Sequence, residues 1–173
     1  SIATMAKISD ISMNGDTNTS YVQMGRSIEI DGTGERLLVG GTIYNTTLTY
    51  EVYIYHRQTS GLYEKKLTAT QQTDISGMNF GISVALSNDG KVMAIATQER
   101  NDAVETGQVI VYDISGTGIG TDLEYSQRGG IIELASINNV DTLGASMSLN
   151  IDGTTIAIAA GSLDSFKGHA YIY

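Results

Sequence analysis

The sequence contains no cysteine, no proline and no tryptophan, and only 17% of its 173 residues are charged. Without cysteine there can be no disulfide framework, no thiolate nucleophile and no Cys-ligated metal site. No apolar run approaches the ~18 residues of a membrane-spanning helix. The start, SIATMAKISD, lacks the basic and apolar regions of a signal peptide. We therefore expect no membrane insertion.

Basic residues are also scarce, because 10 Lys and Arg face 19 Asp and Glu, for a net charge of −9. Nucleic acids and anionic membrane surfaces are bound by clustered Lys and Arg, so neither is an expected partner. A hydrophobic content of 41% is enough to fill the core of one domain. The 20 glycines, together with many Thr and Ser, favour strands and tight turns over helices. An all-β domain is the first prediction.

One sequence unit recurs three times, anchored on Gly25, Gly81 and Gly144. In each copy a second glycine follows nine residues later, and the copy ends in an apolar-aromatic segment. The copies begin MGRSIEIDGTGERLLVGG, FGISVALSNDGKVMAIAT and LGASMSLNIDGTTIAIAA, and they end YEVYIY, GQVIVY and GHAYIY. Repeats at this spacing are typical of propeller blades or solenoids.

Each copy predicts a series of antiparallel strands. The first segment alternates apolar and polar residues, and the next (LLVGG, VMAIA or IAIAA) is apolar on both faces, as in a strand covered on two sides. Gly32–Gly34, Asp89–Gly90 and Asp152–Gly153 supply hairpin turns between them. A more polar fourth strand is predicted in LYEKKLTAT from Leu62 and within LEYSQRGGIIEL from Leu123.

These patterns predict a β-propeller of four-stranded antiparallel blades, formed by 1–173 as a single unit with repeats at about 24–79, 80–142 and 143–173. The last copy lacks its fourth strand, and residues 1–23 read as an outer strand that would close the ring. Propellers typically have about four to eight blades. We therefore expect a piece of a longer propeller, or a half that pairs with another copy into a ring of about six blades. A compact monomer would instead favour a closed sandwich or a solenoid.

The pattern FGxSVAL…DG…AIA…GxVxVY, most complete at 80–112, resembles the FG-GAP repeats of integrin-α-type propellers. The similarity covers roughly 24–56, 80–113 and 143–173. The resemblance implies an extracellular propeller that in many members holds Ca²⁺ in the first hairpin of a blade, through a DxDxDG-like loop.

The corresponding loops are shorter here, and none keeps three alternating oxygen ligands before its second glycine. The candidate metal ligands are Asp31, Asp89 and Asp152. We expect these residues to serve hairpin geometry, since Asp-Gly suits a tight turn without any metal. Calcium would need ligands from other loops, and no cofactor is expected.

The loops after the inner strand vary between copies while their flanks stay regular, and repeat scaffolds tend to place binding surfaces in such loops. Tyrosine supplies flat amphipathic contact area for proteins or glycans. The partner-contact candidates are Tyr44, Thr46, Tyr50, Asn101, Asp102, Asp164 and Phe166. Two N-x-[S/T] sequons make Asn18 and Asn45 candidate glycosylation sites on a eukaryotic secretory route.

The sequence contains no G-x-S-x-G nucleophile elbow, no H-E-x-x-H zinc motif and no P-loop. We expect no catalytic or metal-binding role for the two histidines, His56 and His169. Carboxylate pairs such as Asp102 and Glu105, or Asp113 and Asp122, would suit glycosidase chemistry, but the sequence around these residues predicts loops. We predict a non-enzymatic, secreted or cell-surface structural or adhesion module that contacts proteins or further copies of itself, as a ring or filament subunit. The alternative is a carbohydrate-binding propeller or a non-catalytic part of a larger glycan-active protein, although the variable loops share no aromatic or carboxylate position.

Overall fold

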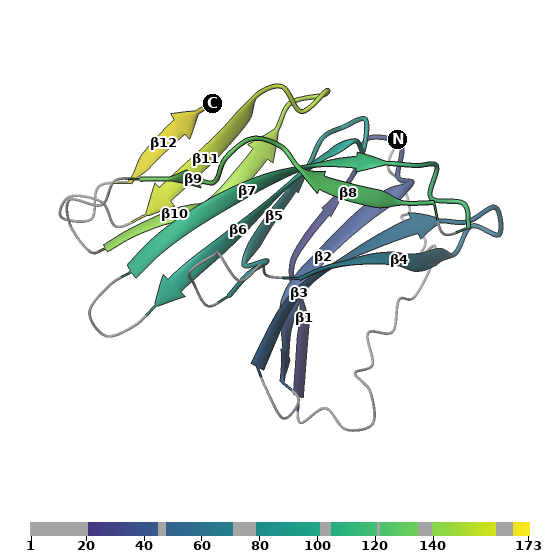
Figure 1. The fold of residues 1–173 in the computed structure, drawn as a ribbon, viewed down its shortest axis with the longest axis horizontal. Coiled ribbons are helices and arrows are strands. Elements are labelled where there is room, and N and C mark those ends of the chain that lie inside the picture. Colours follow the sequence, from purple (N-terminus) through teal and green to yellow (C-terminus); the bar gives the residue numbers. More distant parts are fainter. Residues whose placement is uncertain are drawn as a thin grey trace, which may run out of the picture.

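The computed structural model describes residues 21–44, 48–70, 79–100, 105–120, 122–134, 140–161 and 168–173. Within these ranges the chain forms twelve β-strands and no helix (Figure 1). The prediction of an all-β fold is therefore confirmed. No helix in the described part of the chain is long and apolar enough to cross a membrane.

Each sequence repeat forms one antiparallel meander, in chain order. The first meander contains β1 (Tyr21–Ile30), β2 (Arg36–Tyr44), β3 (Leu48–Arg57) and β4 (Tyr63–Thr70). The second contains β5 (Ser83–Leu86), β6 (Val92–Arg100) and β7 (Glu105–Ser115), and both β8 (Glu124–Gln127) and β9 (Ile132–Glu133) pair with β7. The third contains β10 (Val140–Leu149), β11 (Ile156–Gly161) and β12 (His169–Ile172).

The strands and turns expected within each copy are present. The polar fourth strand of the first copy is β4, and that of the second copy is β8 followed by the short β9. Gly34, Gly90 and Gly153 close the first hairpins in the left-handed region, with φ of 70°, 70° and 66°. The outer strand expected in 1–23 needs a shorter boundary, because residues 21–23 belong to β1 and residues 1–20 lie outside the described ranges.

The meanders stack face to face, and the two faces of each inner strand pack on different neighbours (Figure 1). Met93 and Ile95 of β6 join a core shared with the first meander, whereas Ala94 and Ala96 join a core shared with the third. A parallel pairing of β7 with β10, limited to two residue pairs, also links the second and third meanders by hydrogen bonds. We call the packed boundary between the first and second meanders the first joint, and that between the second and third meanders the second joint.

The first joint brings backbones together at a repeat glycine. Gly81 has φ +81°, and a Cβ placed on it would lie 2.7 Å from Cγ2 of Val52 and 3.4 Å from Cα of Gly40. Ser27 donates a 2.7 Å hydrogen bond from its hydroxyl to the carbonyl of Gly81. The glycine is therefore required both by its backbone conformation and by the close approach of the first meander.

The second joint repeats this arrangement. Gly144 has φ +87°, and a Cβ placed on it would lie 2.6 Å from the Ala96 Cβ and 3.2 Å from Cγ2 of Val109. Ala96 and Val109 hold the repeat positions of Gly40 and Val52. The described meanders form no closed ring, so the structure shows antiparallel sheets, and the propeller itself is taken up below as a proposal.

Candidate functional site

A groove of about 350 Å³ opens where the hairpin turns of the first meander meet the loop between β7 and β8. Most of its lining residues have polar side chains, and one of them, Ile119, is an exposed apolar residue. The lining residues are Thr33, Glu35, His56, Arg57, Gln58, Thr59, Gly61 and Ile119. The first meander contributes all of these except Ile119, so the groove lies across the edge of the first joint.

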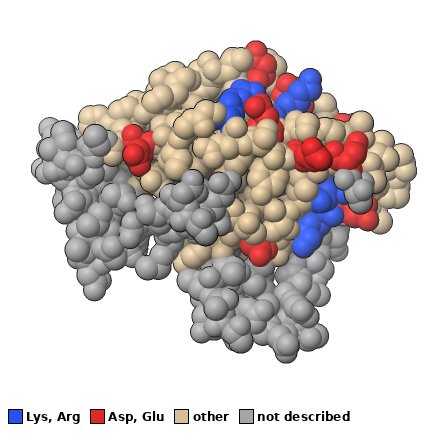
Figure 2. Space-filling view, viewed as in Figure 1, with Lys and Arg blue, Asp and Glu red and all other residues tan. Residues whose placement is uncertain are grey.

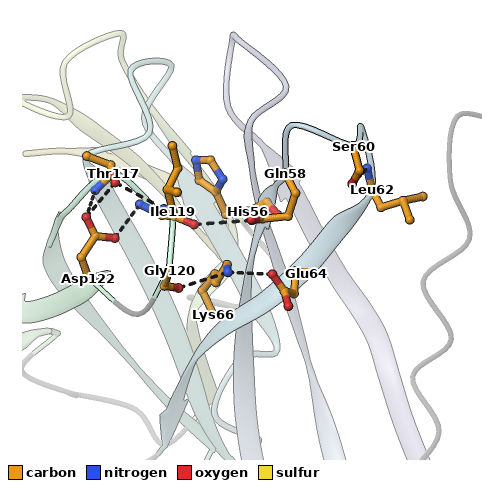
Figure 3. A network of polar contacts seen from close by, with 11 residues as sticks. His56, Gln58, Ser60, Leu62, Glu64, Lys66, Thr117, Ile119, Gly120 and Asp122 are labelled. Carbon is orange, nitrogen blue, oxygen red and sulfur yellow. Dashed lines mark hydrogen bonds and ion pairs between the residues drawn. The ribbon is translucent and has the colours of Figure 1, made fainter.

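His56 is the buried polar group of this groove, with 6% of its surface exposed. Its Nδ1 atom is buried and has no hydrogen-bond partner in the described part of the chain. Gly118 lies directly against the imidazole ring, so that a Cβ at Gly118 would overlap the ring atoms. Gln58 donates hydrogen bonds to the carbonyls of His56 (3.2 Å) and Gly118 (3.5 Å), which attaches the β7–β8 loop to the end of β3 (Figure 3).

The β7–β8 loop is shaped by the carboxylate of Asp122. It accepts hydrogen bonds from the Thr117 hydroxyl (2.7 Å), the Thr117 amide (2.9 Å) and the Gly118 amide (3.0 Å) (Figure 3). These bonds, the one from the Thr117 hydroxyl first, hold the pKa of Asp122 below its usual value. Lys66 fastens the same loop from β4, with a 3.1 Å bond to the Gly120 carbonyl.

The carboxylates Asp113 and Asp122, considered as a pair from the sequence, each have a polar partner of their own. Asp113 lies in β7 rather than in a loop, and it forms an ion pair with Arg128. Asp122 is occupied by the donors of its own loop. Glu105 likewise begins β7, while Asp102 lies outside the described residues.

The three candidate metal ligands each bind donors of their own hairpin. The buried Asp31 accepts a 2.8 Å bond from the Glu35 amide and bonds from the Thr33 hydroxyl. Asp89 accepts bonds from the Ser87 hydroxyl (2.6 Å) and the Lys91 amide (3.1 Å), and Asp152 from the amide and hydroxyl of Thr154.

The pKa of two of these carboxyls is lowered. For Asp152 the main cause is the Thr154 hydroxyl bond. For Asp89 burial raises the pKa, but the bonds from Ser87 and Lys91 outweigh it. These contacts support the turn interpretation. Among the residues that the structure describes, no group of three or more His, Cys, Asp or Glu is placed to hold a metal ion.

The partner-contact candidates are not gathered into one described surface. Tyr44 is the last residue of β2, and Tyr50 lies in β3, half-buried against the core of the first joint. The other candidates, Thr46, Asn101, Asp102, Asp164 and Phe166, lie outside the described residues, as do the sequons at Asn18 and Asn45. Their partner and glycan roles stay predictions.

Charged side chains of both signs are mixed on the face shown in Figure 2, with red and blue atoms side by side in its upper right part. On that face the described Lys and Arg therefore form no separate basic surface. Much of the rest of the described surface in this view is uncharged.

Sequence reasoning missed the groove beside His56. The run GTGIGTD at 116–122 indicates a tight loop, because Gly, Thr and Asp are dense there. No sequence rule, however, pairs that loop with the end of β3, more than 50 residues earlier.

No protein-family model matches the chain, and no curated protein sequence matches it significantly. The resemblance to FG-GAP repeats therefore rests on the motif residues themselves.

Proposed function

We propose that the chain is a non-enzymatic structural or adhesion module of the β-propeller type, located outside the cell or on its surface, that acts through contacts with other proteins. One observation carries the proposal: two successive joints repeat the same glycine contact, Gly81 on Gly40 and Gly144 on Ala96. Sheets that follow one another through an identical joint are the building principle of a propeller.

Two further contacts support a rigid scaffold. At the turn edge of the first joint, the Gly32 amide donates a 2.9 Å bond to the Asn88 carbonyl. At the second joint, the Asp89 amide donates a 3.0 Å bond to the Ile151 carbonyl, which holds the repeat position of Asn88. A scaffold joined by close backbones presents its surfaces without reorganising on binding, and this reduces the cost of association.

A bead-adhesion assay tests the proposal. Beads coated with the folded chain should adhere to other beads coated with the chain, and the adhesion should survive periodate oxidation of sugars. Coating with thermally unfolded chain is the control and should abolish adhesion. Adhesion to polysaccharide-coated beads alone would overturn the proposal in favour of glycan recognition.

Carbohydrate binding is the second candidate, and the groove beside His56 favours it. Glu35, Arg57 and Gln58 offer the hydrogen-bonding groups that sugars require, and Ile119, 64% exposed, adds an apolar surface. Saturable binding of a polysaccharide fragment by calorimetry, lost in Glu35→Ala, would support this reading. Glu124→Ala, an exposed change on β8 away from the groove lining, is the matched control.

A further inference from the structure

The two outer faces of the stack carry the residue types that are buried inside its joints. We define the head face as the side of the first meander that points away from the second, and the tail face as the side of the third meander that points away from the second. Ser27 contacts the second meander, so Ile28 and Ile30 lie on the head face, paired with Val39 and Leu37 of β2.

Ile28 and Ile30 occupy positions that are buried in the next repeat. The corresponding residues, Val84 and Leu86, are each 5% exposed in the first joint. Ile28 is 61% exposed and Ile30 is 49% exposed. On β1 the head face therefore exposes two apolar side chains at positions that fill a joint elsewhere in the same chain, whereas Leu37, Val39 and Tyr55 on the same face are already buried.

The tail face shows the complementary half of a joint. Ala157 and Ala159 of β11 hold the repeat positions of Ala94 and Ala96, which are fully buried in the second joint. Register places these two alanines beside Ser148, Ser146, Ala170 and Ile172. Ile172 is 67% exposed, although Val111 at its repeat position is only 9% exposed. A shallow groove of about 170 Å³ runs across this face.

The repeat glycines align the two faces. By register, Ala159 and Ala170 correspond to the pair Ala96 and Val109 that receives Gly144 in the second joint. Gly25 holds the position of Gly81 and Gly144 and has a similar φ of +91°. In the described part of the chain, no heavy atom lies within 4 Å of a Cβ placed on Gly25.

A second pair of glycines at one repeat position, Gly107 and Gly168, shows that the tail face is also open where a joint would be closed. Gly107 lies so close to β10 that a Cβ placed on it would be 2.6 Å from the Leu143 nitrogen. Gly168 holds the corresponding position in the third repeat, and among the described residues a Cβ there would meet only the Ala160 carbonyl of its own meander, at 3.6 Å. Both glycines of an open joint are thus present, one on each end of the chain.

We propose that the tail face of one chain binds the head face of a second copy, in a third joint that continues the two internal ones. Gly25 of the second copy would lie on Ala159 and Ala170, and Ser146 would donate to its carbonyl, as Ser27 does to Gly81. The contact is heterologous, so it closes a ring or extends into a filament, depending on the rotation between copies. This inference rests on the proposed function and names the partner of the module.

The chemistry of the tail face favours another copy over a charged partner. The described residues of this face are Ser, Ala, Gly and Ile and carry no charge. Each copy carries a net charge of −9, so two copies repel one another until salt screens the charge. Association should therefore strengthen as ionic strength rises.

Sedimentation equilibrium with blocked variants tests the proposal. Ile28→Glu blocks the head and Ala159→Arg blocks the tail, and the wild type should associate while each variant alone associates at least about tenfold more weakly. An equimolar mixture of the two variants should form a 1:1 heterodimer and nothing larger, because the free tail of the head-blocked variant pairs with the free head of the tail-blocked variant and both remaining faces are blocked. Ile151→Glu and Ser126→Arg are matched controls, as both residues are exposed and lie off the two faces.

Three outcomes would overturn the proposal: a wild type that stays monomeric, a head-blocked variant that still self-associates, or a mixture that does not form the heterodimer. Ile30→Lys and Ala170→Arg replace either variant if its circular dichroism shows that it fails to fold. Bead adhesion separates this inference from the proposed function. If the folded, blocked variants still self-associate like the wild type and beads coated with them adhere equally, another surface mediates adhesion, so the proposed function stands and the third joint is rejected.

Discussion

The guanidinium of Arg36 donates a 2.6 Å hydrogen bond to the carbonyl of Gly90, and thereby ties β2 to the first hairpin turn of the second meander. The same side chain also bonds the carbonyl of Gly116 at 2.5 Å. At the second joint, Arg128 donates a 2.9 Å bond to the carbonyl of Gly153, the repeat counterpart of Gly90. Each described joint is therefore closed at its turn edge by an arginine of the preceding meander.

Replacing the guanidinium group of Arg36, which bonds two carbonyls, should weaken the first joint. Arg36→Lys keeps the charge but cannot reach both carbonyls in the planar geometry of the guanidinium. We expect the free energy of unfolding to fall by about 1.5–3 kcal/mol, the range for hydrogen bonds that involve a charged group. Urea unfolding followed by circular dichroism measures this change. Arg26→Lys is the control, because Arg26 is exposed and makes only one 3.5 Å hydrogen bond, to Asn79, within the described structure. Equal losses in the two variants would contradict the bridging role.

The joint glycines should show a cost beyond backbone strain. Gly144→Ala forces an L-residue to φ +87° and also drives a Cβ into Ala96. Gly129→Ala imposes a similar φ, +70°, but in the described structure nothing lies within 4 Å of the new Cβ. We expect Gly144→Ala to lower the free energy of unfolding by at least about 1 kcal/mol more than Gly129→Ala, which isolates the packing contribution. Equal denaturation midpoints for the two variants would refute the close contact.

The repeat pattern was sufficient to predict the meanders, because strand alternation and Asp-Gly turns are local properties of the chain. The run VMAIA predicts an inner strand, and its two faces do pack on different neighbours, with Met93 and Ile95 on one face and Ala94 on the other. The parallel pairing of Val140 with Glu105 could not be predicted, since it depends on how the second and third meanders meet.

The groove beside His56 could not be predicted from the sequence either, because it forms between elements far apart in the chain. His56 directly follows the apolar-aromatic segment YEVYIY in the sequence, and nothing local indicates that Gly118 would cover its ring. The sequence predicts a loop at Asp113, because the apolar-aromatic segment GQVIVY ends one residue earlier, whereas β7 continues to Ser115. Contacts between elements far apart in sequence depend on tertiary packing, which a single sequence does not encode as a local pattern.

Thr117 should control the acidity of Asp122. Because hydrogen bonds, the one from the Thr117 hydroxyl first, lower the folded pKa of Asp122, its stabilising contribution is present above the unfolded pKa and is lost as the pH falls through the folded pKa. Thr117→Val removes the hydroxyl donor but keeps the two amide donors. We expect the pKa of Asp122 to rise part of the way to its usual value, measured from the carboxyl carbon shift in NMR. An unchanged pKa would show that the hydroxyl contributes nothing.

Calcium should leave the thermal stability unchanged. Asp31, Asp89 and Asp152 already accept hydrogen bonds within their own turns, so a metal ion would have to displace those donors. We expect melting temperatures in about 1 mM CaCl₂ and in excess EDTA to agree within about 1 °C, since a ligand stabilises only through binding to the folded state. A rise with calcium that EDTA reverses would contradict the turn interpretation.

Ile95 and Ile28 should respond differently to the same truncation. Ile95 is fully buried in the first joint, so Ile95→Ala should lower the free energy of unfolding by about 2–5 kcal/mol. Ile28→Ala should cost less than about 1 kcal/mol at low protein concentration, because 61% of the side chain is already exposed. If the head face binds a second copy, the cost of Ile28→Ala should grow as the concentration rises, because association of copies then adds to the wild-type stability. Urea unfolding at two protein concentrations about a hundredfold apart measures both effects, and a large cost that does not depend on concentration would place Ile28 in the core of the monomer.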